Sequence, residues 1–166
     1  FTPAELQLKD MEAAAFSGRY ALFMEVGTGK TVVSTVAAKM WNSDHTIVVG
    51  PPILNTQWSE WLKSVGEEDV SIFAGPGRKE DLLNHKWVIM SHAIWRDSFE
   101  TIKHYFLNKD VSVIVDESQA LKSPASKLFK TVSQFIAPDR KLLLLTATPT
   151  SKPEDTYSYI KLKTPT

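Results

Sequence analysis

Residues 24–31 combine glycines, a lysine and a hydroxyl in the order that a phosphate-binding loop requires, because they read MEVGTGKT. Glycines let successive backbone N–H groups turn toward phosphate oxygens, and a helix N-terminus adds partial positive charge. Lys30 would reach the β- and γ-phosphates, and the Thr31 hydroxyl would bind the Mg²⁺ that bridges them. The general pattern asks for glycine where this chain has Met24. This segment alone therefore does not distinguish a phosphate-binding loop from a glycine-rich strand-to-helix turn that binds no ligand.

A pair of acids follows the most apolar predicted strand, VSVIV at 111–115. Asp116 could bind a metal through water, and Glu117 could orient an attacking water. An acidic turn after a strand is also a common solvated feature. Because the pair follows the glycine-rich loop in the correct order, the two together favour a magnesium nucleotide site.

Short apolar runs alternate with segments of helical periodicity along the whole chain. Strands are predicted at 20–24, 46–50, 70–73, 86–90, 111–115 and 141–145, and helices at 4–15, 32–41, 53–65, 93–107 and 124–136, with a short one from Pro153. Such alternation predicts an α/β fold with a mainly parallel central sheet covered by helices on both faces. Ligands bind at the carboxyl ends of strands in such sheets. The loops that follow the strands are therefore expected to meet at one edge.

Composition sets limits on the function. The 166 residues suffice for one domain, and they are 43% apolar and 23% charged, with 19 basic and 19 acidic residues. Without cysteine, disulfides and thiolate zinc sites are excluded. No apolar run approaches the roughly 20 residues that span a bilayer, so we expect no membrane partner and an intracellular protein, cytoplasmic or in the nucleoid or nucleus. Balanced charge means that any nucleic-acid contact must be local.

Five segments, taken in order, resemble superfamily 2 helicases and translocases, most closely their Swi/Snf-like branch. Residues 24–31 resemble motif I in that family's own spacing, 116–119 resemble motif II, and 145–149 resemble motif III. Residues 48–58 resemble motif Ia, and 90–93 resemble the DNA-strand motif that follows it. The resemblance covers almost the whole chain. It implies a three-layer RecA-like domain of the P-loop NTPase class that couples ATP hydrolysis to movement on DNA, with backbone contacts to duplex DNA.

The resemblance also implies roles for individual residues. The catalytic candidates are Lys30, Asp116, Glu117 and Gln119. The nucleotide contacts are Asp10, Glu25, Val26, Gly27, Thr28, Gly29, Lys30, Thr31 and Val32, and the magnesium ligands are Thr31 and Asp116. Nucleic-acid contacts are expected at Pro51, Gln57, Ser91 and His92. Coupling between the nucleotide and DNA is expected from Thr146 and Thr148.

The sequence departs from the family pattern in three places. Asp10 stands where relatives use glutamine to read adenine, and a carboxylate can accept but cannot donate a hydrogen bond. Gln119 stands where many relatives have histidine. The chain ends soon after motif III, so 1–166 is expected to be a single ATP-binding lobe whose second RecA-like lobe, with its arginine finger, belongs to a longer protein. Alone, the chain is expected to bind Mg-nucleotide weakly and to hydrolyse it poorly.

Other interpretations compete with this one. A P-loop enzyme of another class, such as a small-molecule kinase, would leave the segments around 57–58 and 146–148 unexplained. A noncatalytic interaction lobe conflicts with the intact loop lysine and acids. Trp41, Trp58, Trp61 and Trp87 lie on apolar faces or in a strand, which favours core packing over base stacking, whereas the role of Trp95 is left open. His92 is also compatible with an ordinary loop position.

Overall fold

The computed structural model describes residues 19–23, 30–75, 83–118, 126–137 and 139–146. Its strands are β1 (Arg19–Phe23), β2 (His45–Gly50), β3 (Val70–Ile72), β4 (Trp87–Ser91), β5 (Val111–Val115) and β6 (Leu142–Thr146). Its helices are α2 (Lys30–Trp41), α3 (Pro52–Ser64), α5 (His92–Asp97), α6 (Phe99–Tyr105) and α7 (Lys127–Ile136).

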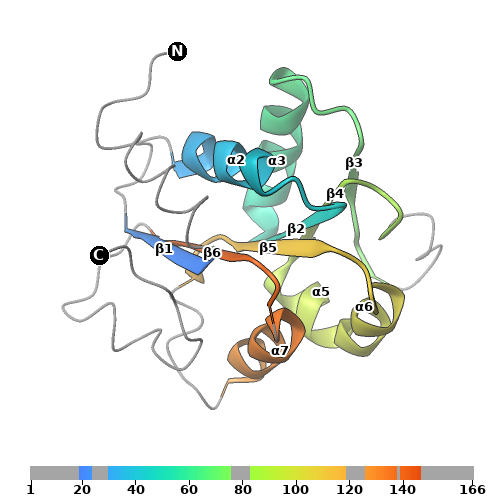
Figure 1. Ribbon diagram of the computed structural model, residues 1–166. Coiled ribbons are helices and arrows are strands. Elements are labelled where there is room, and N and C mark those ends of the chain that lie inside the picture. The colour runs from blue at the N-terminus through green and yellow to red at the C-terminus, as the bar shows by residue number, and fades with distance from the viewer. Residues whose placement is uncertain (1–18, 24–29, 76–82, 119–125, 138, 147–166) are drawn as a thin grey trace.

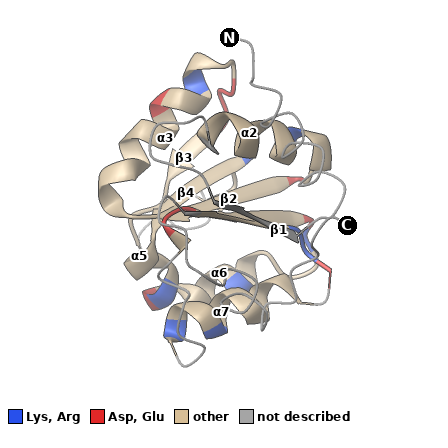
Figure 2. Ribbon diagram, turned by 90° about the vertical axis from the view of Figure 1, so that its left-hand side faces the viewer, with Lys and Arg blue, Asp and Glu red and all other residues tan. Residues whose placement is uncertain are grey.

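All six strands form one parallel sheet in the order β1-β6-β5-β2-β4-β3. Helices α2 and α3 cover one face, and α5, α6 and α7 cover the other (Figure 1). Figure 2 shows the same two-sided cover from a perpendicular direction, with charged positions on the helices of both layers. The predicted three-layer α/β fold with a parallel sheet is confirmed.

Alternating strand residues supply a separate core to each face. Ile47 and Val49 of β2 join the cluster that contains the α5, α6 and α7 residues, whereas Val48 between them joins the α2 and α3 cluster. The middle of β2 is therefore apolar at every position, as expected for a strand buried on both faces.

The predicted helix at 93–107 is interrupted in the structure. Helix α5 ends at Asp97 and α6 begins at Phe99, with Ser98 between them at φ −106° and ψ 11°. The rings of Trp95 and Phe99 both reach Phe135 of α7, at centroid distances of 5.1 and 6.5 Å. The helix is thus interrupted at Ser98, and serine is a modest helix former. Aromatic side chains on both sides of the interruption pack against α7.

Most remaining helix and tryptophan predictions agree with the described residues. Trp41, Trp58 and Trp87 are buried, and Trp95 is completely buried, which decides the one open case in favour of the core.

Helix α7 begins at Lys127, later than predicted, because the Ser126 hydroxyl caps it by accepting from the Phe129 N–H at 3.0 Å. The predicted helices at 4–15 and from Pro153 lie outside the described residues. In the part of the chain that the structure describes, every helix is too short or too polar to cross a membrane.

Candidate functional site

The strand ends bring together several predicted site residues. Because the sheet is parallel, all carboxyl ends lie along one edge, where Phe23 pairs with Thr146 and Gly50 pairs with Ser91. Asp116 follows β5, between β6 and β2 in the sheet order. Strands β1 and β2 are consecutive in the chain but are separated in the sheet by β6 and β5. Such a reversal of strand order is where ligands bind in open α/β sheets.

Asp116 is held from several directions. Its carboxylate Oδ2 accepts from the Trp58 indole Nε1–H at 2.9 Å, and its Oδ1 accepts from the Glu117 backbone N–H at 2.9 Å. Its own backbone N–H donates to the Val49 carbonyl at 2.7 Å, and its carbonyl accepts from His92 Nε2 at 2.9 Å. Only 3% of the residue is exposed. The carboxylate is therefore fixed in direction before any ligand arrives.

Glu117 has an unusual backbone. Its φ is +53°, in the left-handed region that non-glycine residues seldom occupy. Residues held in such conformations cost of order 1–3 kcal/mol and cluster at active sites. The conformation turns the chain sharply just after β5, so that two consecutive acids can take different directions.

Gly50 leaves the room that Asp116 needs. A Cβ atom placed on Gly50 would lie 3.2 Å from the Asp116 Cβ, closer than most such contacts. A glycine at the end of β2 therefore allows the acid to pack closely beside the neighbouring strand.

Helix α2 begins at the predicted phosphate-binding residues. Lys30 is its first residue, and Thr31 is half-buried in its first turn. The hydroxyls of Thr35 and Ser34 donate to the Thr31 carbonyl at 2.7 and 3.0 Å. The Trp61 indole N–H donates to the Thr35 hydroxyl at 3.0 Å, which ties α3 to α2. The N–H groups of the first helical turn can bind an anion.

The oxygen donors at this edge suit Mg²⁺. Among the described residues, no group of three or more His, Asp or Glu side chains could enclose a metal ion. Mg²⁺ is usually bound by one or two carboxylates together with phosphate oxygens and water, rather than by a cage of protein ligands. Asp116 and the Thr31 hydroxyl, the two magnesium ligands predicted from the sequence, would be donors of that kind and stay a prediction.

The predicted nucleic-acid residues have different surroundings. Gln57 is exposed on α3, and Pro51 is the half-buried N-cap residue of that helix. The Ser91 hydroxyl accepts from the Ile94 N–H at 3.1 Å and so caps α5, and only 6% of the residue is exposed. His92 donates to the Asp116 carbonyl. A direct nucleic-acid contact stays a prediction for all four.

The pKa of His92 is lowered from the ordinary histidine value, mainly because burial disfavours the charged ring. The hydrogen bond to Asp116 opposes this change, Arg96 adds to it, and the Asp116 and Glu117 charges oppose it. Since a carbonyl can only accept, the bonded Nε2 carries a proton in the neutral ring.

Trp58 is the residue of this site that the sequence prediction placed only in the core. A buried indole N–H needs a partner, and Trp58 lies in the segment that resembles motif Ia. Those two facts could have marked it as a contact of the site, but not which residue it contacts. The other predicted site residues Asp10, Glu25, Val26, Gly27, Thr28, Gly29, Gln119 and Thr148 lie outside the described residues, and of Thr146 the structure describes the backbone at the end of β6.

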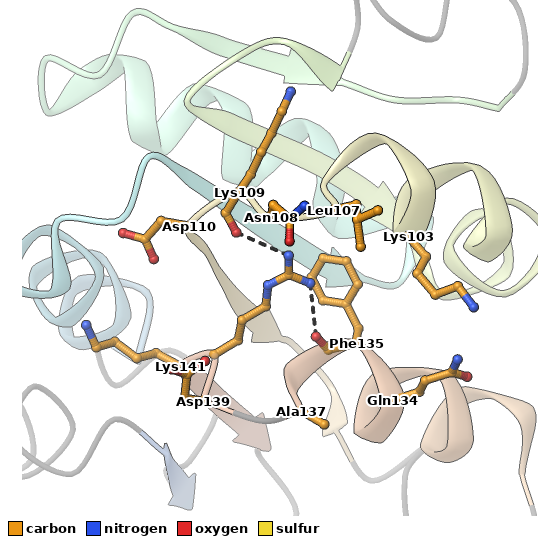
Figure 3. Close-up of a pocket in the computed structure, with 11 residues that line it drawn as sticks. Lys103, Leu107, Asn108, Lys109, Asp110, Gln134, Phe135, Ala137, Asp139 and Lys141 are labelled. Atoms are coloured by element: carbon orange, nitrogen blue, oxygen red, sulfur yellow. Dashed lines mark hydrogen bonds between the residues drawn. The ribbon is translucent and has the colours of Figure 1, made fainter.

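A pocket of about 560 Å³ lies at the opposite edge of the sheet, next to the start of β5 and β6. Lys109, Asp110 and Lys141 are among the residues that line it (Figure 3). The Arg140 guanidinium donates to the carbonyls of Phe135 and Lys109, both at 3.1 Å. An arginine bonded to backbone carbonyls is a structural feature, so this pocket is separate from the candidate site.

The sequence matches the DEAD/DEAH box helicase family over residues 5–156. It is 24% identical over 151 residues to the DNA annealing helicase and endonuclease ZRANB3 of Bos taurus, covering 87% of this chain and 14% of that protein. It is 25% identical over 160 residues to the SWI/SNF-related matrix-associated actin-dependent regulator of chromatin subfamily A-like protein 1 of Xenopus laevis, covering 93% of this chain and 16% of that protein.

Two solved structures have the same fold. The Sulfolobus solfataricus SWI2/SNF2 ATPase core in complex with dsDNA aligns with a TM-score of 0.76 and 22% identity, over 97% of this chain and 35% of that one. The Pyrococcus furiosus Hef helicase domain aligns with a TM-score of 0.75 and 16% identity, over 97% of this chain and 36% of that one. The chain thus corresponds to about a third of each solved chain and to a much smaller share of the curated relatives.

Proposed function

The chain belongs to the DEAD/DEAH box helicase family, and from this membership we propose that it is the ATP-binding lobe of a DNA-dependent ATPase that couples hydrolysis to movement on DNA. The resemblance to the first RecA-like lobe of a Swi/Snf-like superfamily 2 protein is confirmed. A P-loop enzyme of another class is not favoured, because the family match runs through nearly all of the chain.

The observation that carries the proposal is the arrangement of Asp116, buried and oriented at the sheet edge where α2 begins. We assign phosphate binding to the first turn of α2 and to Lys30, together with the loop before it. When bound, Mg²⁺ would neutralise phosphate charge, held by Asp116 and Thr31. Glu117 would orient the attacking water and accept its proton.

We further propose that this chain is one lobe of a longer protein. The chain spans 14% to 16% of the curated relatives it matches and 35% to 36% of the solved chains. We propose that a second RecA-like lobe completes the ATP site, and that duplex DNA is bound through its backbone, partly by α3. The protein would then act where DNA is present, in a nucleoid or a nucleus. This chain alone would bind Mg-ATP weakly and turn it over slowly.

The test uses the protein that carries this chain, with and without duplex DNA. Lys30→Ala should abolish nucleotide binding and DNA-stimulated turnover. Glu117→Gln should keep ATP binding and slow turnover by about 10²- to 10⁴-fold, the usual contribution of a positioned general base.

Exposed Lys130 on α7 offers a matched control, because Lys130→Ala removes a lysine from the face of the sheet opposite α2 and α3. Unchanged nucleotide binding and stimulated turnover in Lys30→Ala would refute the proposed site.

A further inference from the structure

Trp58 connects the inner side of helix α3 to the proposed metal-binding acid. Its indole Nε1–H donates to Asp116 Oδ2 at 2.9 Å across a separation of 58 residues in sequence, and both side chains are buried. The neighbouring Gln57 is exposed on the outer side of the same helix. Two adjacent residues of α3 therefore have different surroundings: Trp58 contacts the acid, and Gln57 lies at the surface.

Burial in this core does not by itself supply an indole with a partner. Trp87 belongs to the same hydrophobic cluster as Trp58 and is equally buried, yet its Nε1 has no hydrogen-bond partner among the described residues. The bond from Trp58 is thus a specific arrangement of α3 against Asp116. A hydrogen bond to a charged acceptor is also among the stronger ones in proteins.

The two oxygens of the carboxylate are held by different parts of the chain. Oδ1 is bonded by the N–H of the next residue, Glu117, so that bond moves with Asp116 itself. Oδ2 is bonded by Trp58 from another element, so the direction of the carboxylate depends on where α3 lies. A carboxylate oxygen has two lone pairs, so an oxygen that accepts a hydrogen bond can also bind a cation or its water.

We propose that Trp58 is a positioning residue: its indole N–H sets the direction of the Asp116 carboxylate for Mg²⁺ and makes that direction depend on helix α3. The inference rests on the proposed function, because it takes Asp116 as a magnesium ligand. A displacement of α3 by a ligand at its outer surface moves the indole relative to Oδ2 and so changes the metal site. We assign Trp58 an action through Asp116 only, and no contact of its own with nucleotide or metal.

Trp95→Phe is the matched control for Trp58→Phe. Trp95 is also buried, and its indole N–H donates at 2.9 Å to a side-chain oxygen, Thr131 Oγ1, but it lies in the core on the other face of the sheet. Both substitutions remove an indole hydrogen bond and the same side-chain volume from a core, but only Trp58→Phe removes a bond to Asp116.

The first measurement requires no ligand. In the ¹⁵N spectrum of the 166-residue chain, Asp116→Asn should shift the indole N–H signal of Trp58 and leave that of Trp95 in place. An unmoved Trp58 signal would show that the bond is absent and would overturn the inference whatever the protein does with ATP.

The second measurement is the Mg²⁺ concentration that half-saturates binding of a fluorescent ATP analogue. Trp58→Phe should raise it about 10- to 100-fold, the usual effect of removing a partner that orients a metal ligand. Metal-free binding of the analogue and the effect of Trp95→Phe should stay within about twofold of wild type. If Trp58→Phe does not fold, benzothienylalanine at position 58 keeps the bicyclic shape and lacks the N–H.

The outcomes separate the two proposals. If Lys30→Ala abolishes binding while Trp58→Phe behaves like Trp95→Phe, the positioning role is refuted and the proposed function stands. If the Trp58 signal shifts as expected but Lys30→Ala and Asp116→Asn leave Mg²⁺-dependent binding unchanged, the proposed function fails, and the positioning role fails with it.

Discussion

At the scale of single residues, the site is organised around Asp116. Its hydrogen bonds reach β2 through Val49, α3 through Trp58 and α5 through His92. A side chain held in this way loses little conformational entropy when it binds a ligand, because its rotamer is already selected. Its orientation is correspondingly sensitive to changes in each of those elements.

His92 should make the folded protein less stable in mild acid. Burial lowers the pKa of its ring, so between that lowered value and the ordinary 6.5 the unfolded chain binds more protons than the folded one. Stability is therefore lost as the pH falls through this range. We expect the wild-type melting temperature to fall further than that of His92→Gln between pH 7.5 and 5.5.

Glutamine is the appropriate replacement because its amide can still donate to the Asp116 carbonyl but does not titrate. His104→Gln, at an exposed position on α6, is the control and should keep the wild-type pH dependence. A wild-type pH dependence in His92→Gln would show that the ring does not titrate in this range.

At the scale of elements, the start of α5 combines a helix cap with a contact to Asp116. Ser91 ends β4 and caps α5, and the first residue of that helix, His92, contacts Asp116. The cap therefore fixes the helix that delivers the histidine. Side-chain caps of this kind satisfy N–H groups that have no partner inside the helix.

Ser91→Ala should cost about 1 kcal/mol of stability, the usual contribution of a serine N-cap. The effect should appear by denaturant unfolding without any nucleic acid. Ser98→Ala is a matched control, because Ser98 occupies the N-cap position of α6 without a side-chain cap bond. Equal stability of the two variants would rule out the capping role and leave a ligand contact as the reason for Ser91.

At the scale of the whole molecule, the two edges of the sheet have different roles. The carboxyl edge carries the acids and the start of α2, whereas at the opposite edge Arg140 joins α7 to the turn after α6. Its guanidinium donates to the carbonyls of Phe135, Phe106 and Lys109 and lies 4.3 Å from the Phe135 ring centroid. Burial lowers the pKa of Arg140, but an arginine stays charged at any physiological pH.

Arg140→Lys should destabilise the fold by about 2 kcal/mol, because an ammonium cannot reproduce the planar fork and leaves carbonyls unpaired. Mg-ATP binding per folded molecule should be unchanged, since the arginine is at the edge away from the proposed site. Lys141→Gln, which removes a cation from the same pocket, should be within about 0.5 kcal/mol of wild type. Wild-type stability of Arg140→Lys would mean that the three bonds contribute nothing net.

The sequence by itself determined the strands and most helices, because apolar periodicity is local and each face of the sheet needs its own core. It also determined the order of the predicted phosphate loop and the acids, since those motifs are short runs of neighbouring residues. The parallel sheet followed from the alternation of strands and helices. The helix break at Ser98 did not, and it accompanies packing of Trp95 and Phe99 against Phe135 in a distant segment, which local periodicity does not contain.

Only the tertiary structure decided how the site is supported. Sequence periodicity predicts Trp58 to be a core residue, and no neighbouring residue indicates that its indole N–H donates to an acid 58 residues away. His92 likewise finds Asp116 across 24 residues, and Ser91 becomes a cap only because α5 begins where β4 ends. Direction and distance between elements arise from packing, and they cannot be read from local spacing. The sequence therefore predicted the residues of a nucleotide site, and the packed sheet determined what holds the proposed acid in place.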